Sequence, residues 1–125
     1  MSTASNILIL VSSICMSSTA HVFLKRGSTV ILQSSFINAQ ALNKAIIVAT
    51  SPWIISGMAM HVCALVIWLW ALSRVDITFA YPFLALGFVL VSLLAHFWIG
   101  ENLPFLRVIG MMIIIFGIYF ICKSG

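Results

Sequence analysis

The sequence predicts an all-α membrane protein built as a bundle of four transmembrane helices. Of its 125 residues, 63% are hydrophobic and only 6% are charged, whereas soluble domains carry about a quarter charged residues. A water-exposed surface cannot be built from so few charges. Four apolar stretches approach the roughly 20 residues that cross a hydrocarbon core as a helix, at about 7–24, 52–72, 77–99 and 103–121. We expect residues 1–125 to form a single transmembrane domain.

A line of polar side chains marks the first span. Ser13, Ser17, His21 and Lys25 recur at every fourth position, so on a helix they form one slowly turning stripe. Polar groups are costly against lipid, and we therefore expect the stripe to face other helices or a water-filled cavity. Such a stripe indicates one wall of a substrate pathway.

The end of this span allows two interpretations. Lys25, Arg26 and Gly27 suit a helix end at the headgroup level, with the glycine as a left-handed cap and the cations at the negative end of the helix dipole. The position of Lys25 in line with His21 and Ser17 favours instead a site that binds an anion.

The second span follows a short helix that we expect at the membrane interface over about residues 39–50. Ser51 and Pro52 are typical of an N-cap and a first helical residue. His61 lies mid-span, where even a neutral imidazole needs a hydrogen-bond partner. We expect it to face the bundle interior on the same side as Trp68, either as a structural bond or as a site residue.

The third span contains Pro82 in its helix rather than at its first position. Proline donates no backbone hydrogen bond and clashes with the preceding turn, so the sequence predicts a kink at Pro82 that opens a crevice. Tyr81 lies next to this kink, and we expect it to contact the substrate.

The fourth span carries Gly110 and Gly117 seven residues apart on one face. Small residues at this spacing let two helices approach closely. We therefore expect these glycines at a dimer interface.

The charged residues restrict the function. The two carboxylates, Asp76 and Glu101, lie at span ends, so no acid is available at membrane depth to bind a cationic drug. We expect Glu101 to stabilise the start of the fourth helix. There is no catalytic set of nucleophile, base and acid, no phosphate loop and no metal cluster, which argues against an enzyme. We expect no cofactor, no metal and no nucleic-acid partner.

Four short motifs identify a family resemblance. They are Ala-Leu-Ser-Arg-Val at 71–75, Ala-Tyr-Pro at 80–82, Gly-Glu-Asn-Leu at 100–103 and Arg-Val-Ile-Gly at 107–110. Their order and spacing resemble the short four-span members of the drug/metabolite transporter superfamily (EamA-like), over about residues 52–122 and more loosely over the first span. The resemblance implies a four-helix bundle that works as a dimer.

Two branches of that superfamily are this short. The small multidrug resistance proteins have an essential glutamate eight residues before a lysine in the first span, and counting back from Lys25 gives Ser17. The chain more closely resembles the paired subunits that flip undecaprenyl-phosphate-linked aminoarabinose. There a non-acidic residue fills the position of Ser17, a polar residue that of His21, and Ala-Tyr-Pro begins the third span.

This resemblance implies a flippase subunit in the bacterial cytoplasmic membrane. It would move a polyprenyl-phosphate-linked sugar by alternating access, as a homodimer or as a heterodimer with a similar four-span subunit. The tail would stay in membrane lipid while only the head crosses. We expect the phosphate and sugar to meet donors and aromatic rings among Ser17, His21, Lys25, Arg26, His61, Trp68 and Tyr81.

Two other functions fit the sequence. One is export of a small soluble metabolite or drug, with His21, His61 or His96 as proton-linked switches. The other is a non-transporting subunit that scaffolds a glycosyltransferase, which would tolerate changes between Ser17 and Lys25.

Overall fold

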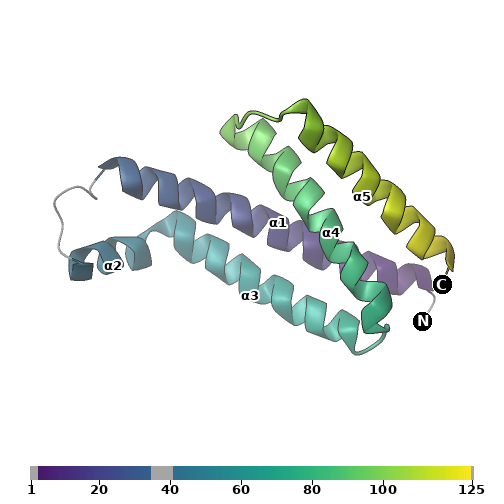
Figure 1. Cartoon of the computed structure of the whole chain (residues 1–125). Coiled ribbons are helices and arrows are strands. Elements are labelled where there is room, and N and C mark those ends of the chain that lie inside the picture. Colours follow the sequence, from purple (N-terminus) through teal and green to yellow (C-terminus); the bar gives the residue numbers. More distant parts are fainter. Residues whose placement is uncertain (1–2, 35–40, 125) are drawn as a thin grey trace.

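The computed structural model describes residues 3–34 and 41–124, and the described part is almost entirely helical. Figure 1 shows the helices in chain order. They are α1 (Thr3–Ser34), α2 (Ala41–Thr50), α3 (Pro52–Leu72), α4 (Ile77–Leu94), the π-helical turn η1 (Ala95–Ile99) and α5 (Phe105–Ser124). No strand occurs in these ranges, and the predicted all-α fold class is confirmed.

Four helical segments of the described part are long and apolar enough to cross a membrane: α1, α3, α4 with η1, and α5. The chain is therefore a multi-pass membrane protein. With 10 residues, α2 is too short to span a bilayer. Residues 39 and 40 of the expected interfacial helix lie outside the described ranges.

The helix α1 is the centre of the bundle. In Figure 1, α3 lies along α1, α4 crosses in front of α1, and α5 packs against α4. In the most apolar window of α1, 33% of the residues are buried, against 6% in α5. The first helix is thus the scaffold, and the last helix is the outermost.

Small residues bring α1 and α3 together. The buried residues of α3 are Gly57, Ala64 and Ala71, which recur at every seventh position and so share one face. A Cβ atom on Gly57 would lie 3.1 Å from the backbone oxygen of Ala20, which shows how closely the two backbones approach. The sequence predicts a small-residue contact in the fourth span, whereas the structure has one between α1 and α3.

The expected end of the first helix at Lys25 to Gly27 is wrong, because α1 continues to Ser34. Gly27 is buried, and a Cβ atom there would lie 2.7 Å from Cγ1 of Ile54 and 3.1 Å from Cβ of Trp53. Gly27 therefore lies inside α1, where the absence of a side chain leaves room for α3. Among the described residues, the positive φ of a left-handed cap is found only at Gly100, with φ 80°.

The structure places Pro82, Gly110 and Gly117 in the expected helices but does not test their expected roles. Pro82 lies inside α4, and the kink there stays a prediction. Gly110 and Gly117 lie on α5, where an added Cβ atom would meet nothing within 4 Å. Their face is open, and the expected dimer contact stays a prediction.

The close contact at Gly27 predicts that Gly27→Ala lowers the stability of the bundle. Overpacking costs about 1–3 kcal/mol, against a gain of up to about 1 kcal/mol in helix propensity. Thermal unfolding of the purified protein in mild detergent measures the difference. The control is Gly87→Ala, whose Cβ atom would meet its nearest neighbour at an ordinary 3.4 Å. Equal melting temperatures for the two variants would contradict the proposed packing.

Candidate functional site

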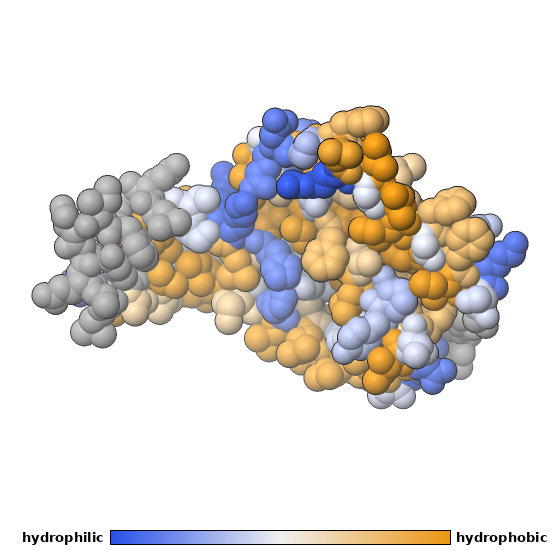
Figure 2. All heavy atoms as spheres, in the orientation of Figure 1, coloured by the Kyte–Doolittle hydropathy of each residue, from blue (hydrophilic) through white to orange (hydrophobic). Residues whose placement is uncertain are grey.

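A cleft of about 590 Å³ lies between α1 and α4. Its α1 wall is largely polar, whereas its α4 wall is mostly apolar. The lining residues are Ile14, Ser17, Ser18, His21 and Lys25 from α1, and Leu84, Gly87, Phe88, Val91 and Ser92 from α4. Figure 2 shows hydrophilic side chains crossing the otherwise apolar face below the connection between η1 and α5. The cleft is amphipathic and opens on this face.

The polar stripe of α1 turns from the inside of the bundle to its surface. Ser13 is 2% exposed, and its hydroxyl donates a hydrogen bond to the backbone oxygen of Leu10 at 2.8 Å. Lys25, three turns later, has a side chain that is 51% exposed. Ser17 is half-buried, and His21 is already exposed. The stripe therefore connects the interior to the open surface, as its slow drift around the helix predicts.

Two histidines meet in the middle of the stripe. Ser17 Oγ lies 3.4 Å from Nδ1 of His61 and shares a hydrogen bond with it. The rings of His21 and His61 have centroids 4.8 Å apart and an interplanar angle of 65°. His61 thus finds the polar partner that its depth in the span requires. The structure brings Ser17, His21 and His61 together across α1 and α3.

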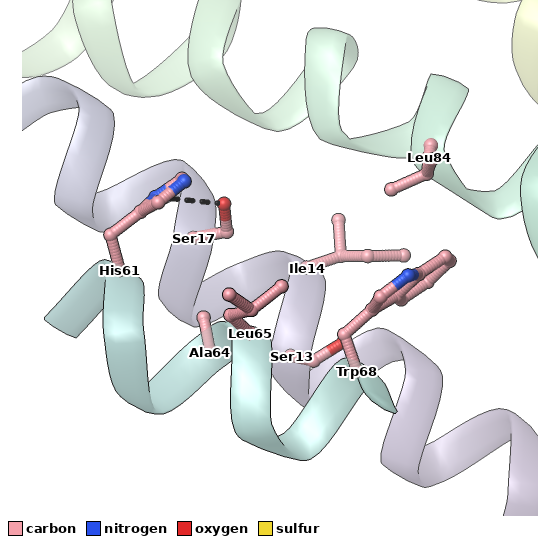
Figure 3. A pocket seen from close by; sticks show the side chains of 8 residues that line it. All are labelled: Ser13, Ile14, Ser17, His61, Ala64, Leu65, Trp68 and Leu84. Atoms are coloured by element: carbon pink, nitrogen blue, oxygen red, sulfur yellow. Dashed lines mark hydrogen bonds between the residues drawn. The ribbon is translucent and has the colours of Figure 1, made fainter. Parts of the chain in front are cut away.

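A second cleft of about 240 Å³ adjoins this cluster where α1, α3 and α4 meet. Figure 3 shows Ser17 and Ser13 from α1, His61 and Trp68 from α3, and Leu84 from α4 around it. Trp68 therefore belongs to the same region as the histidines. Tyr81 is 56% exposed and contacts Trp68, with ring centroids 6.5 Å apart.

The two adjacent cations at the end of the stripe have different surroundings. The guanidinium of Arg26 lies 5.1 Å from the centroid of the Trp53 ring, a cation–π contact at the start of α3. Lys25 lines the cleft and forms an ion pair with Glu101. The structure thus places Lys25 at the cleft and directs Arg26 toward α3.

The Lys25–Glu101 pair was not foreseen from the sequence. Glu101 was expected to stabilise the start of the fourth helix, but α5 begins at Phe105 and the carboxylate pairs with Lys25 on α1. In the described part of the chain, no cluster of three His, Cys, Asp or Glu side chains could hold a metal ion. The chemistry of the cleft rests on charges, hydroxyls, imidazoles and aromatic rings.

The fold and the cleft define a small four-span membrane protein with a polar path between its helices. No protein-family model matches the chain, and no solved structure matches it. It is similar to curated bacterial proteins that are each named "Probable 4-amino-4-deoxy-L-arabinose-phosphoundecaprenol flippase subunit ArnE". The similarity expected from the sequence motifs is confirmed.

Three of these relatives show the extent of the similarity. The Enterobacter sp. protein is 33% identical over 66 residues, which are 53% of this chain and 62% of the relative. The Pectobacterium atrosepticum protein is 36% identical over 70 residues, 56% of this chain and 62% of the relative. The Pseudomonas aeruginosa protein is 36% identical over 75 residues, 60% of this chain and 65% of the relative. The chain thus matches a little under two thirds of each relative's length. The relatives and the four spans agree with the expected location in the bacterial cytoplasmic membrane.

An aqueous cleft predicts a pattern of thiol labelling along α1. Thiols react as thiolates, which form in water and not in lipid. In a background in which Cys15, Cys63 and Cys122 are replaced by alanine, Ser17→Cys and His21→Cys should react with a membrane-impermeant maleimide. Ser12→Cys is the matched control, because Ser12 is exposed on α1 but lies outside both clefts. Equal labelling at all three positions would show that no separate aqueous path exists.

Proposed function

We propose that this chain is a subunit of a flippase that moves a polyprenyl-phosphate-linked sugar, or a similar anionic lipid-linked substrate, across the membrane. It would act as a transporter and not as an enzyme. The observation that carries the proposal is the cleft between α1 and α4, which has a polar wall, an apolar wall and a lysine at its edge.

The shape of this cleft suits a lipid with a polar head. Its volume of about 590 Å³ falls within the roughly 300–1,000 Å³ typical of small-molecule sites. Leu84, Phe88 and Val91 offer an apolar surface for the first part of a polyprenyl chain. The head would lie against the hydroxyls and imidazoles of α1, so that only the head leaves the lipid.

The charges support a phosphate in the head. Lys25 is the cation that lines the cleft, and an ammonium forms strong charge-assisted hydrogen bonds with phosphate oxygens. His21 and Ser17 lie about one and two turns deeper along the same wall. Arg26 contacts Trp53, and we propose that it helps to position α1 and attracts anions from a distance.

The sugar would occupy the deeper part of the path. Trp68 and His61 line the smaller cleft next to Ser17, and an aromatic face with neighbouring donors suits a sugar ring. Tyr81 lines neither cleft and would help to position Trp68, whose ring it contacts. The names of the relatives specify an amino sugar linked to phosphoundecaprenol, and we propose a substrate of this class.

We propose that the working unit is a dimer, either of two identical chains or of this chain with a similar four-span subunit. The relatives are named as flippase subunits, which supports an assembly. In the described part of the chain, the residues that line the cleft come from α1 and α4, and a second bundle would provide the other walls and gate. Rocking of the two bundles about the cleft would give alternating access. The open face of α5 at Gly110 and Gly117 would carry the contact.

A second candidate function is proton-linked transport of a small soluble solute. The contact between His21 and His61 favours it, because histidine changes its protonation near neutral pH and two adjacent imidazolium ions repel each other. This function predicts solute flux whose pH dependence is lost in His61→Gln. Flux of the lipid-linked sugar that does not depend on pH would exclude it.

The proposed phosphate site predicts slower flipping in Lys25→Ala and His21→Ala. Proteoliposomes would receive undecaprenyl-phosphate-linked 4-amino-4-deoxy-arabinose, and an impermeant amine reagent would report the amount in the outer leaflet. A hydrogen bond to a charged group contributes about 1.5–3 kcal/mol, so we expect about a tenfold to hundredfold loss of rate. Lys123→Ala, at the end of α5, is the control. Wild-type rates in both cleft variants would refute the site, and a wild-type protein without any flux would favour a scaffolding subunit.

The proposed dimer predicts that Gly117→Leu shifts the protein to the monomer. A leucine side chain would fill the space that a second helix needs for close approach. Native mass spectrometry in mild detergent measures the oligomer. Met112→Phe is the control, because this exposed residue lies on another face of α5. A dimer of unchanged stability in Gly117→Leu would place the interface elsewhere.

A further inference from the structure

The ion pair between Lys25 and Glu101 lies at the edge of the cleft, and Glu101 belongs to the connection between two spans. The Lys25 side chain is 51% exposed and that of Glu101 is 34% exposed. Ion pairs with this exposure are weak where water reaches them, because water competes for both charges. The pair is therefore able to exchange its partners for those of a ligand without disrupting the fold.

The backbone around Glu101 is held firmly in place. The π-helical turn η1 and the left-handed Gly100 redirect the chain after α4. The backbone N–H of Glu101 donates to the oxygen of Ala95 at 3.3 Å, and its own oxygen accepts a hydrogen bond from Nδ1 of His96 at 2.7 Å. Single π-helical turns occur frequently at functional sites. Here the turn fixes the backbone of Glu101 and leaves its carboxylate opposite Lys25.

Glu101 is the carboxylate that lies next to this cleft, where it pairs with the lining residue Lys25. The sequence contains two acidic side chains, Asp76 and Glu101. Asp76 is the N-cap of α4, whereas Glu101 follows the turn at the other end of that helix. A cationic group bound near Lys25 would therefore have Glu101 as its available counter-ion.

We propose that Lys25 and Glu101 select a head that carries both a phosphate and a primary amine. The inference rests on the proposed function and assigns a specificity-determining role to Glu101. The phosphate of the ligand pairs with Lys25, and its ammonium group pairs with Glu101. Both charges of the protein therefore keep a partner. A ligand with phosphate alone leaves the Glu101 carboxylate unpaired beside a second negative charge, which disfavours its binding.

The same chemistry is present in an amino sugar linked to polyprenyl phosphate and in the headgroup of phosphatidylethanolamine. The test therefore uses the full chain in phosphatidylcholine nanodiscs, a lipid without a primary amine. Native mass spectrometry would measure binding of undecaprenyl phosphate, of undecaprenyl-phosphate-linked 4-amino-4-deoxy-arabinose, and of the N-acetylated form of that lipid. Phosphatidylethanolamine is then added as a competitor.

We expect the wild-type protein to bind the free-amine lipid at least tenfold more tightly than the N-acetylated lipid. Glu101→Gln should lose this preference and should bind undecaprenyl phosphate several-fold more tightly, because the competing carboxylate is gone. Glu101→Asp should retain part of the preference. Asp76→Asn is the matched control and should behave as wild type. Melting temperatures show whether each variant is folded. If Glu101→Gln fails to fold, Glu101→Asp is compared with the wild-type protein instead.

The outcomes separate this inference from the proposed function. If Glu101→Gln keeps the wild-type preference for the free amine, the inference is overturned. If the wild-type protein binds all three lipids equally and Lys25→Gln weakens them all, the phosphate site stands and the role of Glu101 fails. If phosphatidylethanolamine displaces the amino sugar lipid, exchange of the Lys25–Glu101 ion pair for the phosphate and amine of a ligand is supported. The ligand is then a phospholipid headgroup. If the wild-type protein binds none of the probes, both proposals fail.

Discussion

The structure depends on the close contact between α1 and α3. Gly27 on α1 and Gly57 on α3 leave room for the opposite helix, and dispersion contacts at this short separation hold helices together in lipid, where the hydrophobic effect between them is weak. The contact also sets the register of the two helices. Ser17 and His21 consequently face His61, so the geometry of the polar cluster follows from the position of two glycines.

The polar residues obey a second constraint, the cost of an unsatisfied group in lipid. Ser13 and Thr19 donate to backbone oxygens of their own helix, which satisfies them without a partner helix. Ser17, His21 and Lys25 instead reach other helices or the connection before α5. The residues that depend on distant partners are the ones that line the cleft, and they are the ones whose surroundings a substrate can change.

Hydropathy predicted the four helices because each span is nearly free of charge, and spacing predicted the polar stripe because a helix turns by a fixed angle per residue. The role of Gly27 could not be predicted, because a glycine after two cations is compatible both with a helix end and with a close helix contact. Only the position of Ile54 decides between them. The Lys25–Glu101 pair could not be predicted, since it joins distant parts of the sequence and depends on the π-helical turn after α4.

The partners of α1 also bear on the synthesis of the protein. His21 meets His61, a residue of the next long helix, and the buried side of α1 is completed by α3 and α4. When α1 leaves the ribosome, these partners do not yet exist, and a lone α1 would present Ser17 and His21 to lipid at a cost. The arrangement favours entry of α1 and α3 into the bilayer together, as a helical hairpin, with α4 and α5 added afterwards.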